Sequence, residues 1–392
     1  MKTLYLVLLI VFTSISANAQ NSSSSVLKSI EENNTTLNAL REKVKLQKLE
    51  NRTGIFLANP EVGFNYLWGN GAVLSNRTDI SVIQTFDIPT ITGMKSRIAD
   101  SENNLVEWQY KADRMNIMLE AKQYCIDLVY YNALRKELDI RLQHAQSISE
   151  SYEKRLKDGD ANILEYNKAQ LNLSTVMREL SRIDVERSAL LSQLKRLNGG
   201  IDVIFEDSQF THIQLPINFD DWYVSAEQMN PVLAYIREEI EVSKKRVSLS
   251  KAMRLPTFSA GYMSEEEVDQ RFQGVSIGVS IPLWENKNRV RQAKAEVRAA
   301  ESREIDSKQQ FYSNLQIQFN RAIGLQATAQ DYRKSLLTTN STDLLKKALD
   351  AGEISLLDYM VEIGFYYETV NQALQAEMEY QKAFAELSVY QE

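Results

Sequence analysis

Residues 159–166 read GDANILEY and residues 352–359 read GEISLLDY, and this pair of related segments decides the fold. The two segments are 193 positions apart, since 352 − 159 = 193. The same shift carries Ile88-Pro89 onto Ile281-Pro282, 70 residues earlier in each half. Two landmarks that keep one offset indicate that the chain arose by duplication.

The duplication predicts two structural repeats, over 20–200 and 222–392, joined by a linker at 201–221. Each repeat is expected to open with a helix, to continue with two strands and to end with a long helical hairpin. The tips of these hairpins are expected near Gly159 and Gly352, because glycine readily ends a helix in a left-handed conformation.

A heptad pattern follows the first tip. Apolar residues recur at alternating steps of three and four from Tyr166 to Leu197, which is typical of a helix packed along a neighbouring helix. Gly199-Gly200 then ends the pattern. The 193-residue shift carries this seam onto positions from Tyr359 to Tyr390, including Glu362. Both repeats are therefore expected to end in coiled-coil helices.

The helices before the tips are expected to be long. Gly93 to Asp158 and Asn286 to Ala351 are each 66 residues without a proline. At 1.5 Å per residue, a continuous helix of this length spans about 100 Å. Such helices are too long to cover only a small sheet.

Four segments alternate between apolar residues and small or polar residues. Val275, Ile277, Val279 and Ile281, for example, alternate with Ser276, Gly278 and Ser280. This pattern, over about ten residues, is typical of membrane β-barrels, although a soluble sheet packed on a helix is an alternative. We expect strands at about 60–69, 79–88, 256–263 and 274–282. We expect polar hairpin tips at 70–77 and 264–270.

Composition excludes several functions. The 392 residues carry a formal charge of −7, from 45 basic and 52 acidic side chains, so no basic field is expected for nucleic acid. The chain has one cysteine, Cys125, and two histidines, His144 and His212. These residues form no metal-binding or catalytic pattern. We therefore expect no enzyme activity, no metal and no cofactor.

The N-terminus is expected to be a signal peptide over residues 1–19. Lys2 precedes an apolar run from Leu4 to Phe12, and Ala17-Asn18-Ala19 precedes a cleavage site at Ala19-Gln20. No cysteine lies near this site, so no lipid anchor is expected. After cleavage, no apolar run of 18 residues remains, and no membrane-spanning helix is expected.

Four strands in one chain cannot close a membrane barrel, since the smallest single-chain barrels have eight. Open strand edges are also costly in lipid. If the strands span a membrane, the chain must therefore oligomerise. Three copies, for example, give twelve strands and twelve helical struts for a tube.

With these features, the sequence resembles the TolC-like outer-membrane efflux proteins over about residues 25 to 390. The similarity rests on the order, duplication and spacing of the quoted segments, together with LPTFSAGY at 255–262. Further carriers are SIGVSIPLWENKNRVRQAKAEVRAAE at 276–301 and RLKDGDANILEYNKAQLNL at 155–173. The resemblance implies a mainly α fold with a small β part: an α-barrel of long antiparallel helices in the periplasm and a 12-stranded barrel in the outer membrane.

The resemblance also implies partners. A homotrimer of this family is the exit duct of a tripartite efflux system, with a periplasmic adaptor and an inner-membrane pump. The segment 281–296 is similar to ducts that work with resistance–nodulation–division pumps for heavy metals. Two alternatives are the same duct in type I protein secretion and, in a different class, a soluble periplasmic coiled-coil scaffold.

Site residues follow from the same resemblance. Gly159 and Gly352 fall at the hairpin tips that dock the adaptor. Asp358 matches an acidic position at the periplasmic entrance, with Glu165 as its first-half counterpart and Glu362 beside it. Three copies of such carboxylates form a negatively charged ring; the alternative is an ordinary solvated helix face. Pro89 and Pro282 are expected at the junction between barrel and helices.

Overall fold

The structure is a computed structural model that describes residues 23–70, 76–86, 89–267, 270–284, 286–339 and 342–390. The expected signal peptide at 1–19 and its cleavage site at Ala19-Gln20 lie outside these residues. The chain forms two compact units, and each contains segments from both halves of the sequence. The first unit consists of Met1–Ala39, Arg114–Ala226 and Tyr312–Glu392, and the second of Leu40–Asp113 and Glu227–Phe311.

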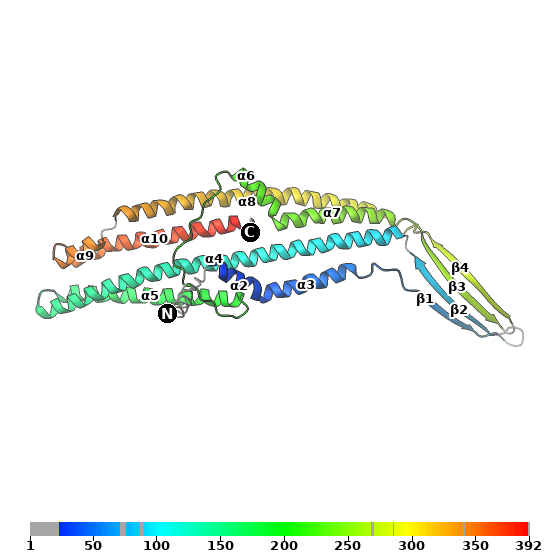
Figure 1. Ribbon diagram of the computed structural model, residues 1–392, viewed down its shortest axis with the longest axis horizontal. Coiled ribbons are helices and arrows are strands. Elements are labelled where there is room, and N and C mark those ends of the chain that lie inside the picture. The colour runs from blue at the N-terminus through cyan, green and yellow to red at the C-terminus, as the bar shows by residue number, and fades with distance from the viewer. Residues whose placement is uncertain are drawn as a thin grey trace, which may run out of the picture. The chain divides into compact units, whose positions relative to one another are not determined.

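The second unit contains a four-stranded antiparallel sheet in the order β1-β2-β3-β4 (Figure 1). The strands are β1 (Glu61–Leu67), β2 (Arg77–Phe86), β3 (Thr257–Glu267) and β4 (Gln270–Ser280). The central pairing joins β2 to β3, with Val82 opposite Tyr262. Strands from the two halves of the sequence therefore form one continuous sheet.

The hairpin between β3 and β4 is longer than the sequence predicted. The expected polar turn at 264–270 is wrong, because β3 continues to Glu267 and β4 begins at Gln270. Glu266 pairs with Arg271 in this part of the ladder. Opposite charges in facing positions stabilise a strand pair, so polar residues continue the sheet here. In the first hairpin, residues 71–75 of the expected tip lie outside the described residues.

The strand register separates apolar from small side chains. One face carries Val62, Phe64, Tyr66, Ile80, Val82, Phe86, Phe258, Ala260, Tyr262, Val275, Ile277 and Val279. The opposite face carries Gly63, Ser81, Thr85, Ser259, Gly261, Ser276 and Gly278. The period of two in the sequence therefore becomes two chemically different faces.

The helical part of the second unit consists of α7 (Pro231–Ala252) and of parts of longer helices. These are the later part of α3 (Thr35–Arg52), the start of α4 (Pro89–Asp158) and the start of α8 (Arg289–Thr339). The Asn230 side chain caps α7, because its Oδ1 accepts a hydrogen bond from the Val232 amide at 2.8 Å. Surface ion pairs connect the helices, such as Arg52 with Asp100 at 2.9 Å.

The regular secondary structure in the described residues of the first unit is helical. Besides parts of α4 and α8, it contains α2 (Ser23–Asn33), α5 (Ile163–Leu197), most of α6 (Phe219–Met229), α9 (Thr342–Asp350) and α10 (Leu356–Ser388). The first long helix, α4, has 70 residues. Its counterpart in the second half comprises α8 and α9, and residues 340–341 between them lie outside the described residues.

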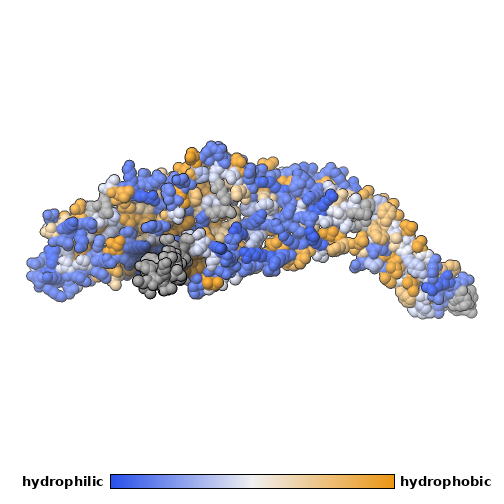
Figure 2. Space-filling model, viewed as in Figure 1, coloured by the Kyte–Doolittle hydropathy of each residue, from blue (hydrophilic) through white to orange (hydrophobic). Residues whose placement is uncertain are grey.

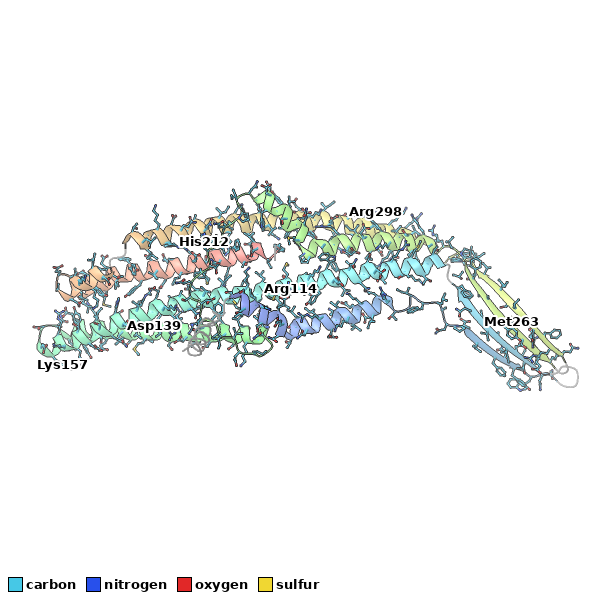
Figure 3. The ribbon with its side chains drawn as sticks, in the orientation of Figure 1. Arg114, Asp139, Lys157, His212, Met263 and Arg298 are labelled. Atoms are coloured by element: carbon cyan, nitrogen blue, oxygen red, sulfur yellow. The ribbon has the colours of Figure 1, made fainter. Side chains whose placement is uncertain are left out.

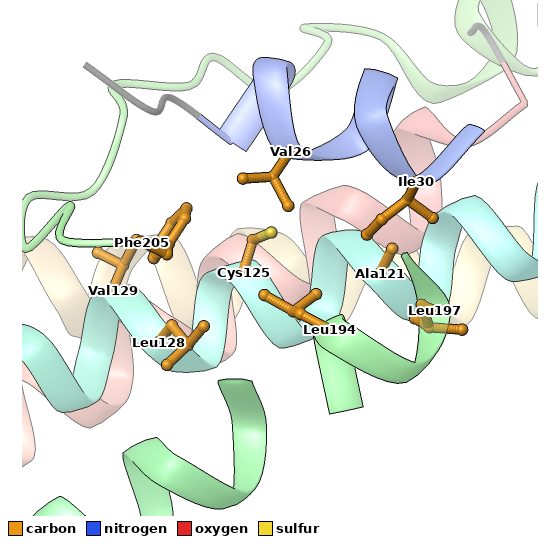
Figure 4. Close-up of a cluster of buried hydrophobic side chains, with 9 residues drawn as sticks. All are labelled: Val26, Ile30, Ala121, Cys125, Leu128, Val129, Leu194, Leu197 and Phe205. Atoms are coloured by element: carbon orange, nitrogen blue, oxygen red, sulfur yellow. The ribbon is translucent and has the colours of Figure 1, made fainter. Parts of the chain in front are cut away.

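A hydrophobic cluster joins α2, α4 and α5 in this unit (Figure 4). Leu128, Leu194 and Ile30 are fully buried within it. Cys125 lies in the same cluster, and burial raises the pKa of its thiol to about 12. Cys125 is therefore a small core residue rather than a reactive group.

The heptad residues of α5 form a buried stripe along one face of the helix. Ala169, Val176 and Ile183, each seven residues apart, are buried. In α10 the register differs by one residue near the tip, because Ile363 is buried while Glu362 is exposed. The expected seam position at Glu362 is thus wrong, since an unpaired carboxylate is not buried where an isoleucine can be.

The segment between the two halves crosses the helices of the first unit. The side-chain amide of Asn132 in α4 donates hydrogen bonds to two backbone carbonyl oxygens, that of Phe205 at 3.3 Å and that of Asp207 at 2.9 Å. Gln381 in α10 donates to the Thr211 carbonyl at 2.7 Å. Helix α6 then begins at Phe219, within the expected linker of 201–221. Side chains of α4 and α10 therefore hold this segment in place.

Candidate functional sites: the sheet face and the helix tips

The apolar face of the sheet is exposed. The side chains of Val62, Val275 and Ile277 are 73%, 84% and 82% exposed, and Figure 2 shows hydrophobic residues over the strands. A soluble monomer rarely exposes so large a continuous apolar surface. This face therefore requires a covering partner, which can be lipid or protein.

The two outer strands also leave backbone groups available. Among the described residues, β1 pairs with β2 only, and β4 pairs with β3 only. Exposed strand edges can pair with another strand, and natural proteins protect or use them. The sheet thus has both an apolar face and two edges that need partners.

The opposite face is shaped by close contacts between small residues. A Cβ atom at Gly261 would lie 2.6 Å from the carbonyl oxygen of Val82. At one end of this face, Arg77 forms ion pairs with Asp79 and Glu265, each at 2.7 Å. This face also carries Ile83, Met263 and Phe272, so its character is mixed, and the ion pairs of Arg77 lie at the hairpin end of the strands.

Pro89 and Pro282 lie at the same end of the sheet. Pro89 is the first residue of α4 and follows Phe86, the last residue of β2, by three positions. Pro282 follows Val279 by three positions, and both Phe86 and Val279 pair with Phe258. Proline suits position 89, because it lacks an amide donor and its φ angle fits the first turn of a helix. Pro282 lies in the non-helical segment between β4 and α8, which begins at Arg289.

The hairpin tips have the same hydrogen-bond construction. The backbone φ angles of Gly159 and Gly352 are +83° and +76°. The Gly159 amide donates to the Leu156 carbonyl at 3.3 Å, and the next amide, of Asp160, donates to Arg155 at 2.8 Å. Gly352 and Glu353 donate in the same pattern, to the residues 193 positions later. Both tips are Schellman motifs, in which glycine takes the left-handed position.

The two carboxylates expected at the entrance cap the helices that follow the tips. Glu165 accepts a hydrogen bond from the Asn162 amide at 2.9 Å, and Asn162 caps α5 in return. Asp358 accepts from the Ser355 hydroxyl at 2.6 Å and forms the same capping box at the start of α10. Each carboxylate therefore stabilises its own helix terminus. Glu362, one turn further along α10, is exposed.

A hydrophobic cluster packs the two tips together in the first unit. It contains Ile148, Tyr152, Ala169, Leu349, Leu356, Tyr359 and Ile363. Beside it is a groove of about 280 Å³ that extends from Ser147 in α4 to Gly352. Lys157, labelled in Figure 3, lies at the end of the first hairpin and pairs with Glu153 at 2.6 Å. The tips therefore present a charged surface over an apolar core.

A buried polar contact between α4 and α10 was not predicted. The Arg141 guanidinium lies 4.3 Å from the centre of the Tyr367 ring and donates to the Asn371 side chain at 2.9 Å. Burial lowers the pKa of Arg141 and raises the pKa of Tyr367 to about 12. His144 lies 3.3 Å from the Tyr367 hydroxyl. Arg141 stands in the charged stretch RKELDIRLQH at 135–144, so nothing local in the sequence distinguishes it from its neighbours.

Metal-binding groups and membrane-spanning helices are both absent from the described residues. These residues contain no group of three or more His, Cys, Asp and Glu side chains that could hold a metal ion. Within the same part of the chain, no helix is sufficiently long and apolar to cross a membrane.

Several solved outer-membrane proteins have the same chain fold. The chain is similar to the solved structure of CusC, with 13% identity, a TM-score of 0.78 and coverage of 96% of this chain and 95% of that one. It is also similar to VceC of Vibrio cholerae, an outer membrane protein, with 15% identity, a TM-score of 0.71 and coverage of 96% and 97%. The CmeC outer membrane channel of Campylobacter jejuni has 15% identity, a TM-score of 0.70 and coverage of 96% and 88%.

No family model and no curated protein matches the sequence. The expected TolC-like fold is nevertheless confirmed by these structures, as a mainly helical chain with one small antiparallel sheet. At this level of identity the comparison establishes the fold, and the function is inferred from the sites.

Proposed function

We propose that this protein is the outer-membrane exit duct of a tripartite efflux system and has no catalytic role. It conducts substrate passively from an inner-membrane pump and a periplasmic adaptor to the exterior. The observation that carries the proposal is the exposed apolar face of a sheet with two unpaired edges, in a chain with the fold of outer-membrane channels.

A homotrimer meets the needs of this sheet. Three copies supply twelve strands, and the β1 edge of one copy pairs with the β4 edge of the next. Closure satisfies the edge amides and carbonyls, which lipid cannot do. The apolar face then contacts lipid and the face with Gly261 and Ser276 lines the lumen, as expected for a barrel with alternating side chains.

The chain organisation supports the same proposal. Two tandem repeats, over 20–200 and 222–392 with a linker at 201–221, each contribute two strands and one hairpin. The matching Schellman motifs and capping boxes at the two tips favour a duplicated origin. The export proposal includes removal of residues 1–19 and no lipid anchor, which mass spectrometry of the mature N-terminus tests directly.

The hairpin tips are proposed to be the periplasmic entrance. The exposed turns at Gly159 and Gly352 are suitable for docking an adaptor, and the pump is proposed to be of the resistance–nodulation–division class. Asp358, Glu165 and Glu362 are proposed to form the entrance ring. Their exposure or half-burial close to the tips supports this role, and Pro89 and Pro282 mark the junction with the barrel.

The first experiment measures the mass of the detergent-extracted protein by light scattering, corrected for bound detergent. The duct predicts a mass close to three chains, recovered from the outer-membrane fraction. Deletion of 60–88 and 256–282 is expected to abolish membrane residence. A monomer or dimer that is extracted without detergent would instead favour the soluble scaffold and contradict the duct.

The entrance ring is tested by conductance in planar bilayers. Neutralising Asp358 by Asp358→Asn is expected to shift the reversal potential in a KCl gradient toward lower cation selectivity. Asp331→Asn, an exposed carboxylate on α8 that lies 21 residues before Gly352, is the matched control. Equal reversal potentials in the two variants and the wild type would contradict the ring while leaving the trimer intact.

A further inference from the structure

A cavity of about 570 Å³ lies within the first unit, between α8, α10 and the linker segment 208–213. His212, labelled in Figure 3, belongs to this segment. Glu137 of α4 forms part of the same wall. The volume is sufficient for a drug-sized molecule and lies within the usual range of ligand pockets.

The cavity coincides with a difference between the two halves. Ala373 lines it, and the 193-residue shift places Ala373 on Leu180, since 373 − 180 = 193. In the first half, Leu180 packs against a cluster of Leu134, Leu138 and Ile183. Replacing leucine by alanine removes three carbon atoms, which leaves space unless the surroundings collapse. In the second half the space has not been filled.

One side of the cavity wall is apolar, and hydrogen bonds fix the position of a tyrosine in the wall. Val370, Ala373 and Leu374 line it from α10. The ring of Tyr380 is fixed, because its hydroxyl accepts from Gln326 at 3.0 Å and donates to the Ile213 carbonyl at 3.3 Å. A rigid surface of this kind can take an apolar body with little loss of conformational entropy.

The charges in the wall do not balance. Arg333 and Glu377 form an ion pair at 2.7 Å. Glu137 is half-buried, and among the described residues it has no hydrogen-bond or ion-pair partner. Arg141, one turn further along α4, interacts with Glu137 through its charge, but the hydrogen bonds of its Nη2 go to α10. With His212 counted as neutral, the wall carries two carboxylates and one guanidinium, a formal charge of −1.

We propose that this cavity binds an amphipathic organic cation, with its apolar body against Val370, Ala373 and Leu374 and its positive group beside Glu137. A cation compensates the unpaired carboxylate, and the tyrosine rings at Tyr366 and Tyr380 add favourable aromatic contact. The site lies within one unit of one chain. It therefore does not rest on the proposed duct, because binding can be measured whatever the protein transports.

The test titrates ethidium, a planar aromatic cation, into the full-length protein in a non-ionic detergent, and follows binding by fluorescence anisotropy. Empty micelles provide the baseline. Wild-type protein is expected to bind one ethidium per chain, and Glu137→Gln to weaken binding about tenfold. Glu150→Gln on the same helix serves as the matched control and is expected to bind as wild type does. Ala373→Leu, which restores the residue found at 180, is expected to weaken binding by more than tenfold.

Each outcome decides the proposal. Saturable binding that falls in Glu137→Gln and Ala373→Leu but not in Glu150→Gln supports it. Unchanged affinity in Glu137→Gln, or equally tight binding of the anionic dye anilinonaphthalene sulfonate, overturns the cation assignment. If Ala373→Leu does not fold, as judged by circular dichroism, the comparison of Glu137→Gln with Glu150→Gln still decides the question.

Discussion

Three glycines end helices in the same backbone conformation but differ in the space around them. Gly159, Gly199 and Gly352 all have φ angles between +66° and +83°. A Cβ atom at Gly352 would meet no heavy atom within 4 Å, whereas at Gly199 it would lie 2.4 Å from the carbonyl oxygen of Asn33. Alanine substitution therefore separates the cost of the left-handed backbone from the cost of a steric clash.

The expected losses follow from these two terms. An alanine in the left-handed conformation destabilises the folded state by about 1–2 kcal/mol. Alanine also lowers the conformational entropy of the unfolded chain, which offsets this loss by about 0.4–1 kcal/mol. Gly352→Ala should thus lower the free energy of unfolding by about 1 kcal/mol. Gly199→Ala adds overpacking against a rigid backbone atom, which costs about 1–3 kcal/mol more. The total for Gly199→Ala is about 2–4 kcal/mol.

The assay is urea unfolding in mild detergent, monitored by far-ultraviolet circular dichroism. Unfolding midpoints are compared between variants whose free energy of unfolding has the same dependence on urea concentration. Gly324→Ala is the control, because Gly324 lies within α8 with open space around it and no positive φ angle. This control is expected to be neutral or stabilising by up to about 1 kcal/mol. Equal midpoints for Gly199→Ala and Gly352→Ala, or a control as unstable as Gly352→Ala, would refute the reasoning.

Three further predictions concern the first unit. Leu128→Ala should lower the free energy of unfolding by about 2–5 kcal/mol in the same urea assay, because Leu128 is fully buried. Ser355→Ala should cost about 1 kcal/mol through loss of the α10 cap, and Ser355→Thr, which keeps a hydroxyl that can donate to Asp358, should retain it. The folded thiol of Cys125 keeps its proton up to a pKa of about 12, against 9.0 for an exposed thiol. Between about pH 9 and 12 the unfolded state therefore loses a proton that the folded state keeps, and stability falls by about 1.4 kcal/mol per pH unit. Cys125→Ala should remove this part of the slope, and a slope identical to the wild type would contradict it.

Local signals in the sequence were sufficient for the helix tips. Glycine followed three residues later by Asn162 or Ser355, and then by an acidic residue, defines a turn and a capping box within one stretch of chain. These hydrogen bonds join residues at most five positions apart, so neighbouring residues alone determine them. The entrance role of Glu165 and Asp358 remains a prediction, because it depends on the other chains.

The ends of strands and the burial of single residues were harder to predict from the sequence where packing against another segment determines them. The polar residues at 264–267 indicated a turn, yet pairing with β4 keeps them in a strand. The one-residue difference between Glu362 and Ile363 has a similar origin, since packing against α4 and α9 selects the apolar residue. In both cases a partner element decides between two locally acceptable conformations.

The sequence by itself determined the 193-residue correspondence between its two halves, the glycine turns of the helical hairpins, and the alternation that makes one strand face apolar. Only the tertiary structure decided that β2 pairs with β3, that Arg141 is buried against Tyr367, and that Ala373 leaves a cavity beside Glu137. The physical reason is the range of the interactions. Helix caps and periodicity depend on neighbours within a few residues, whereas strand pairing, burial of charge and packing volume depend on segments that are brought together only when the chain folds.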